Sequence, residues 1–143
     1  MNEGNPMAEP NAIYLTRYFP HPPAKIWVAL TEPAHIANWW APGNIRPVVG
    51  HRFVLDMGAW GQQQCEVLAV EHEKLISYTY AEGILNTTIT WTLEAEGMGT
   101  RLTLVHSGFD LDSPIGKQAF EGMKNGWPVV LGRIGQLFIT ANG

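Results

Sequence analysis

The sequence predicts an α+β fold in which one curved, six-stranded antiparallel sheet wraps around a long C-terminal helix, with two short helices after the first strand. Three observations predict it. Short β-type segments fill the middle of the chain with only a few residues between them, and such short connections require antiparallel neighbours. Two of these segments alternate apolar and polar residues. The last 30 residues carry an apolar stripe with helical spacing, and a sheet with one dry face packs naturally against such a helix.

The first part of the chain predicts one strand and two short helices. Residues 12–19 are rich in β-branched and aromatic side chains, which favours a strand. A proline cluster ends the strand, and proline is well tolerated in a first helical turn, so we expect a short helix over residues 24–30. Residues 31–33 break this helix and offer a cap for the second one, which we expect over residues 34–40.

The middle of the chain predicts five further strands. They are residues 52–57, 63–70, 75–80, 85–93 and 101–107. In residues 85–93 the odd-numbered positions include Ile89, Trp91 and Leu93, while the even-numbered positions are polar. Leu102, Leu104 and His106 likewise share one face of the last strand. One face of the sheet is therefore expected to be dry. The pattern of residues 63–70 leaves its inward-facing parity open.

The C-terminal region predicts the long helix. Ser113 and Pro114 form a typical helix start, with serine as N-cap and proline at the first helical position. Apolar residues then recur at three- and four-residue steps: Phe120, Met123, Trp127, Val130, Leu131, Ile134, Leu137 and Phe138. Several glycines lower the helix propensity, so the helix must depend on burial of this stripe. Pro128 predicts a kink near residues 124–126.

Composition excludes several classes of function. The formal net charge is −4 and the nine basic residues are scattered, which argues against a nucleic-acid surface. The single cysteine, Cys65, permits neither an intrachain disulfide nor a cysteine-built metal site. The chain shows neither a signal peptide nor an apolar run long enough for a membrane span. We therefore expect a cytoplasmic protein with a flexible tail at residues 1–11 and a single domain at residues 12–140.

Three motifs resemble a known family. Residues 21–27 (HPPAKIW), followed by Thr31-Glu32-Pro33 and Trp39-Trp40, are similar to the opening signature of proteins related to the activator of the heat-shock-chaperone ATPase. Residues 99–109 (GTRLTLVHSGF) resemble the family's late strand, and Gly126-Trp127 resembles its last helix. The resemblance spans about residues 14–138. Pro128 departs from the family pattern.

This resemblance implies the helix-grip superfamily, which is also described as START-like, birch-pollen-allergen-like or SRPBCC. Its members enclose a cavity between the sheet and the last helix, and include lipid and hormone carriers, polyketide cyclases and co-chaperone domains. We expect a binding protein for a small apolar, lipid-like or aromatic molecule. An enzyme of the polyketide cyclase or dehydratase type in the same cavity and a co-chaperone-like interaction domain are the alternatives, because a fold does not fix a function.

The candidate ligand-binding residues are the large apolar side chains expected around this cavity, with one histidine and two tyrosines. They are Trp39, Trp40, Phe53, Met57, Tyr78, Tyr80, Trp91, His106, Phe109, Met123, Trp127 and Leu131. Each of them also fits an ordinary core position. His106 could orient a ligand or transfer a proton, or could be a core histidine satisfied by hydrogen bonds.

No catalytic constellation, metal site or cofactor motif is evident in the sequence, so we expect no catalytic residue, metal or cofactor. Cys65 is expected to be a buried, inert thiol. The pair Trp39-Trp40, if exposed, offers a homodimer contact as another alternative.

Overall fold

The computed structural model describes residues 10–142, and the side chains as far as residue 138. In chain order the elements are β1 (Ile13–Phe19), α1 (Pro23–Thr31), α2 (Pro33–Trp39), β2 (Arg52–Asp56), the short 3₁₀ turn η2 (Gly58–Trp60), β3 (Gln62–Glu71), β4 (Leu75–Tyr80), β5 (Thr87–Glu96), β6 (Gly99–Ser107) and α3 (Pro114–Asn142). The expected tail at residues 1–11 lies mostly outside the described residues. Asn11 exchanges two hydrogen bonds with the backbone of Phe109.

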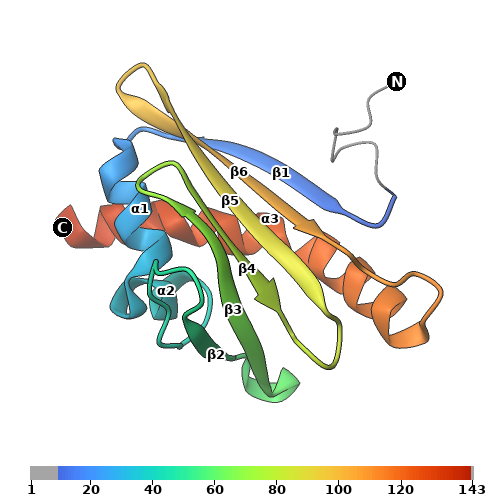
Figure 1. Ribbon diagram of the computed structural model, residues 1–143. Helices are drawn as coiled ribbons and strands as arrows, with labels where there is room; N and C mark the ends of the chain where they lie inside the picture. The colour runs from blue at the N-terminus through green and yellow to red at the C-terminus, as the bar shows by residue number, and fades with distance from the viewer. Residues whose placement is uncertain (1–9, 143) are drawn as a thin grey trace.

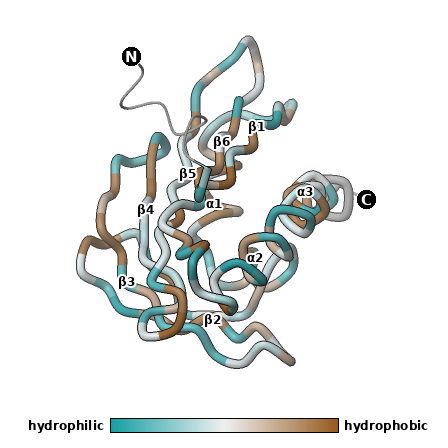
Figure 2. Tube along the Cα trace, turned by 90° about the vertical axis from the view of Figure 1, so that its right-hand side faces the viewer, coloured by the Kyte–Doolittle hydropathy of each residue, from teal (hydrophilic) through white to brown (hydrophobic). Residues whose placement is uncertain are grey.

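The six strands form one antiparallel sheet in the order β1-β6-β5-β4-β3-β2. Figure 1 shows α3 crossing behind the sheet, with α1 and α2 at one end. In Figure 2, turned by 90°, α3 forms a separate layer beside the sheet and α2 adjoins it. The predicted fold class, α+β with a long C-terminal helix over an antiparallel sheet, is confirmed.

The two central strands have the predicted alternation. Ile89 pairs with His106 and Trp91 pairs with Leu104, and all four side chains are fully buried. Their neighbours along the strands, such as Thr90, are partly exposed on the outer face. Helix α3 covers this dry face and leaves the other face to solvent. For that reason, apolar and polar residues alternate along the strands.

Strand β3 changes its inward parity halfway along. Before the change, alternate residues face the interior: Gln63, Cys65 and Val67. The register shifts between Val67 and Ala69, and Leu68 is left 46% exposed. After this β-bulge, Val70 pairs with the buried Ile76. A bulge inserts one extra residue and so resets the alternation, which explains why no single parity fits the sequence of this strand.

Strand β5 begins at Thr87, two residues later than expected. The preceding residues belong to a tight turn, in which the N–H groups of Ile84, Leu85 and Asn86 all point to the carbonyl oxygen of Ala81, at 2.9–3.0 Å. Asn86 has a positive φ of 53°, a conformation that asparagine tolerates better than most residues. Because these three N–H groups are already paired, the ladder with the neighbouring strand starts only at Thr87.

Helix α3 starts at the predicted N-cap. The Ser113 side-chain oxygen accepts a hydrogen bond from the N–H of Gly116 at 3.3 Å. The helix continues past Pro128, so this proline does not end it, while the expected kink stays a prediction. The apolar stripe faces the sheet: Trp127, Leu131 and Ile134 are buried. No helix within residues 10–142 is long and apolar enough to cross a membrane.

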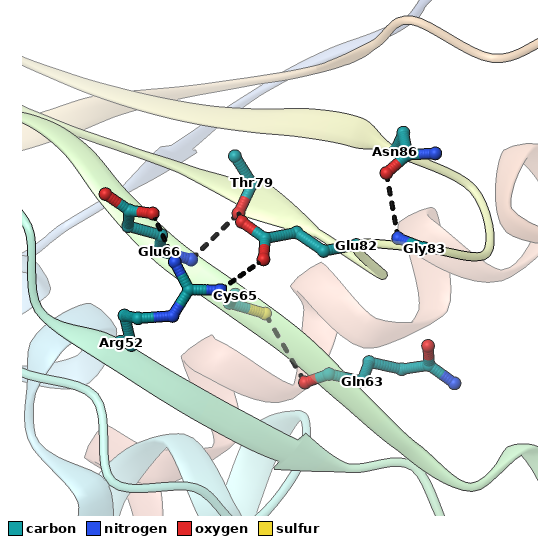
Figure 3. A network of polar contacts seen from close by, with 8 residues as sticks. All are labelled: Arg52, Gln63, Cys65, Glu66, Thr79, Glu82, Gly83 and Asn86. Carbon is teal, nitrogen blue, oxygen red and sulfur yellow. Dashed lines mark hydrogen bonds and ion pairs between the residues drawn. The ribbon is translucent and has the colours of Figure 1, made fainter.

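The outer face of the sheet carries a polar network around Arg52 (Figure 3). Its guanidinium donates to Glu66 and to Glu82, each at 2.6 Å. Glu82 in turn accepts a hydrogen bond from the Thr79 hydroxyl at 2.8 Å. The network therefore joins β2, β3 and β4 with the start of the β4–β5 turn on the side opposite α3. Ion pairs this exposed contribute little to stability individually.

Candidate functional site

The interior between the sheet and α3 is occupied by a continuous cluster of aromatic side chains, which we call the interior cluster. It is built from the candidate residues and extends from α2 across the sheet to α3. Trp91 on β5 lies at its centre and makes edge-to-face contacts with Trp39 of α2 and Trp127 of α3, with ring centroids 5.6 Å apart in both pairs. Trp40 contacts Trp127 with centroids at 5.0 Å. Such edge-to-face pairs are a favoured aromatic geometry.

A chain of hydrogen bonds runs through this cluster from the helix to the sheet. The Trp127 indole N–H donates to His106 Nδ1 at 3.1 Å, so Nδ1 must be unprotonated. His106 Nε2 therefore carries the proton and donates a hydrogen bond to the Thr87 hydroxyl oxygen at 2.8 Å. Thr87 donates in turn to the carbonyl oxygen of Tyr80 at 3.1 Å. In this series of hydrogen bonds, from Trp127 through His106 and Thr87 to Tyr80, each donor points to the next group.

This arrangement fixes His106 as a neutral imidazole. Burial lowers its pKa from the ordinary value of 6.5 to about 3. Both ring nitrogens are occupied, and protonation of Nδ1 would place two N–H donors face to face. A general acid or base needs a pKa near the operating pH and a free nitrogen toward the substrate. His106 offers neither, so the geometry favours the satisfied core histidine over the proton-transfer role.

The two tyrosines of β4 also stay neutral. The Tyr78 hydroxyl accepts a hydrogen bond from the Trp91 indole N–H at 2.8 Å. Burial raises the pKa of both Tyr78 and Tyr80 well above the ordinary value. The interior cluster therefore contains no charged side chain, and the indole groups of Trp91, Trp127 and Trp39 all donate inside the protein.

Three of the candidate residues lie at the margin of the cluster. Trp40, Met57 and Met123 are half-buried and pack against the buried core. Both methionines are unbranched and flexible, which lets such side chains adapt to different neighbours. Trp40 stacks on Tyr80 with ring centroids 5.9 Å apart. These three side chains are the points where the interior cluster reaches the surface.

The remaining candidates are buried in the same interior. They are Trp39, Phe53, Tyr78, Tyr80, Trp91, His106, Phe109, Trp127 and Leu131. The structure thus brings the whole candidate set to one side of the sheet, while its role in ligand contact stays a prediction. The expectation that Trp39 and Trp40 form an exposed pair is wrong. Trp39 is fully buried, and its indole N–H donates to the Ala29 carbonyl oxygen at 2.7 Å. That side chain offers no dimer contact.

One buried polar group was not anticipated from the sequence. Gln63 on β3 is only 7% exposed, and its amide nitrogen donates to the Trp60 carbonyl at 2.9 Å. Its amide oxygen, Oε1, is buried and is the one such side-chain atom without a hydrogen-bond partner among the described residues. Figure 3 shows Gln63 beside Cys65, whose sulfur points to the Gln63 carbonyl oxygen. Three consecutive glutamines (residues 62–64) suggest a solvent-exposed segment. Only the strand register shows that the middle one faces the interior.

Cys65 itself fits an inert thiol. It is buried on β3, where it pairs with Phe53 of the neighbouring strand β2. Burial raises the pKa of the thiol to about 12, although the backbone of Ala81 acts in the opposite direction. Thiolate is the reactive form of cysteine, so this side chain is not suited to nucleophilic chemistry.

Two open hollows lie away from the interior cluster. The larger one, of about 750 Å³, is lined by the β3–β4 turn and parts of β1, β5 and β6, including Glu71, Glu73 and Glu94. The smaller one, of about 440 Å³, lies between residues 31–33 and the loop at 44–51. Neither includes any of the candidate residues. Within residues 10–142, no three His, Cys, Asp or Glu side chains gather as metal ligands would.

Comparisons with known proteins agree with this architecture. Protein MLL2253 from Mesorhizobium loti has a crystal structure with a TM-score of 0.80 and 37% identity, covering 90% of this chain and 97% of that one. BH1534 from Bacillus halodurans is 27% identical over 87% of this chain and 94% of its own, with a TM-score of 0.76. DynU16, from the dynemicin biosynthetic locus, shares the fold at 21% identity and a TM-score of 0.80, covering 93% of this chain and 49% of its own.

Among proteins with curated descriptions, none matches this chain. The family described as "Activator of Hsp90 ATPase homolog 1-like protein" matches residues 20–138, a range that contains all three motifs and the whole interior cluster. The chain therefore belongs to this family, as its opening, late-strand and last-helix motifs predict.

Proposed function

We propose that residues 12–140 act as one domain that binds a small, largely apolar molecule, aromatic or lipid-like, between the sheet and α3. The observation that carries this proposal is the interior cluster. Its aromatic rings meet on one side of the sheet, and the His106 imidazole and the buried indole N–H groups are hydrogen-bonded inside the protein. The apolar faces of the rings are therefore what the cluster offers to a ligand, and sites for small molecules are typically lined in this way.

Binding would begin at the half-buried margin. A ligand that displaces the side chains of Met57 and Met123 would gain contact with the aromatic rings behind them. Burial of about 200 Å² of apolar ligand surface contributes about 5 kcal/mol at the usual 25 cal/mol per Å². Flexible methionines lower the cost of such a displacement, because they can repack without leaving a polar group unpaired.

The same geometry favours binding over catalysis. An enzyme of the cyclase or dehydratase type needs at least two convergent polar groups, one of them with a pKa tuned to proton transfer. His106 is neutral and doubly hydrogen-bonded, and the pKa values of Tyr78 and Tyr80 are raised away from neutrality. The interior thus lacks an obvious acid–base pair.

The test uses N-phenyl-1-naphthylamine, an uncharged aromatic probe whose fluorescence rises in apolar surroundings. We expect saturable binding at one site. Met57→Ala and Met123→Ala should each change the dissociation constant at least about threefold, because they alter the margin of the interior cluster. Met98→Ala is the matched control, since Met98 is 92% exposed on the β5–β6 turn. No saturable binding, or an equal effect of all three substitutions, would contradict the proposal.

Native mass spectrometry of the purified protein adds an independent test. We expect a retained small molecule of low polarity, released when the protein unfolds. If no compound is retained and a library of lipids and aromatics produces no thermal shift, the ligand-binding proposal fails.

A further inference from the structure

Gln63, which carries the unpaired amide oxygen, lies on the interior face of the sheet. Gln63 pairs with Leu55 across β2 and β3, and paired residues of antiparallel strands point to the same face. Leu55 is fully buried. Met57, two residues after Leu55 and just past the end of β2, donates its backbone N–H to the carbonyl oxygen of Gly61 at 2.9 Å, across the turn from Gln63. Gln63 therefore stands beside one of the residues through which a ligand would enter.

The orientation of the Gln63 amide is fixed by its other half. Its nitrogen donates to the Trp60 carbonyl at 2.9 Å, and a flipped amide would place two oxygen atoms against each other. The free group is therefore the acceptor, Oε1. A buried acceptor without a partner costs about 1–3 kcal/mol, so its presence in a core needs an explanation.

We propose that Gln63 Oε1 is the polar recognition point of the ligand site, and that the natural ligand carries a hydroxyl or N–H donor on an otherwise apolar, ring-sized body. This inference rests on the proposed function. The His106 imidazole and the indole N–H groups of the buried tryptophans are occupied by internal hydrogen bonds, whereas Oε1 is free to accept one. The ligand class is thereby narrowed from any apolar molecule to one that carries a hydrogen-bond donor, such as a phenol.

The experiment compares 2-naphthol with its O-methyl derivative, 2-methoxynaphthalene, which lacks the hydroxyl donor; both are titrated by isothermal titration calorimetry. The wild type should bind 2-naphthol about tenfold more tightly, the size expected for one buried hydrogen bond. Gln63→Met has a similar shape without the acceptor, and should bind both probes within about twofold of each other. Gln64→Met is the matched control, because Gln64 is exposed on the opposite face, and it should keep the preference.

The outcomes separate this inference from the proposed function. Binding of both probes to the wild type without a preference, or a preference that survives in Gln63→Met, overturns the role of Gln63 and leaves the apolar site standing. If neither probe binds to the wild type, the result overturns both the role of Gln63 and the proposed ligand site. Gln63→Leu provides a second acceptor-free variant if Gln63→Met does not fold by circular dichroism.

Discussion

Acidification should destabilise this protein through one buried histidine. In the unfolded chain, His106 binds a proton near its ordinary pKa of 6.5, whereas in the folded protein the pKa is lowered to about 3. Between these values the unfolded state holds more protons than the native state, so the free energy of unfolding falls as the pH falls. The contribution of His106 is fully present above about pH 7.5 and is lost from pH 6.5 downward. Tyr80, whose ring meets the imidazole edge-on with centroids 5.5 Å apart, stays neutral throughout this range.

The size of the effect follows from the proton linkage. Each pH unit of this window is worth about 1.4 kcal/mol, so from pH 7.5 to pH 4.5 the loss caused by His106 alone is about 2.5 kcal/mol. Other histidines and carboxyl groups also titrate over this range. The comparison must therefore be made against a variant that keeps them all and removes only the imidazole.

The matched variant is His106→Gln, whose amide can accept from Trp127 and donate to Thr87. Urea unfolding of both proteins, followed by far-UV circular dichroism at half-unit steps of pH, gives the two stability curves. We expect the stability advantage of the wild type over the variant to shrink by about 2.5 kcal/mol from pH 7.5 to pH 4.5. A constant difference between the curves would refute the reasoning, because it would mean that His106 titrates alike in both states.

Three further predictions concern the interior and its margin. Trp127→Phe leaves His106 Nδ1 without its donor and should lower the free energy of unfolding by about 2–3 kcal/mol, whereas Trp60→Phe, at a residue 79% exposed, should change it by less than about 0.5 kcal/mol in the same urea titration. Cys65 should react with Ellman's reagent only slowly at pH 8 in the native protein and rapidly in denaturant, because a thiol with a pKa of about 12 is almost entirely protonated; equal rates would show that the side chain is accessible. Gln63→Met should raise the free energy of unfolding by about 1 kcal/mol, because the gain from removing a buried orphan exceeds the lost bond to Trp60; a decrease would indicate that a water molecule satisfies the amide oxygen.

The sequence predicted the fold wherever one physical signal ran the whole length of an element. In β6 the alternation of Leu102, Leu104 and His106 is unbroken, and these residues are fully buried. In α3 the apolar stripe continues past Pro128, so helix spacing outweighed the local preference of proline. The motif at residues 21–27 identified the family, and the match over residues 20–138 confirms it.

Strand β3 could not be oriented from its sequence, because its alternation changes phase at the bulge between Val67 and Ala69. Each half of the strand taken alone supports a different inward face. The same strand contains Gln63, the polar residue that the candidate site missed. Once the register with Leu55 is known, the inward direction of Gln63 follows at once.

The hydrogen-bonding pattern of the interior also lay beyond sequence reasoning. The sequence placed His106 on the inner face but left open whether it was free to act. The answer depends on Thr87 and Trp127, which are 19 and 21 residues away along the chain and meet it only in the folded protein. Local patterns indicate which face a side chain occupies, while its partners are set by how the elements pack.

The bond between Trp127 and His106 has a consequence for how the protein selects one structure. Apolar residues recur along α3 every three or four positions. A helix displaced by one turn, about 5.4 Å, would therefore keep similar apolar contacts with the sheet. Such a displacement would place Met123 or Leu131 where Trp127 meets the imidazole, and neither side chain can donate a hydrogen bond to Nδ1. Only one placement of the helix gives Nδ1 its hydrogen-bond donor, so this one bond selects the native alignment of α3 among alternatives with similar apolar contacts.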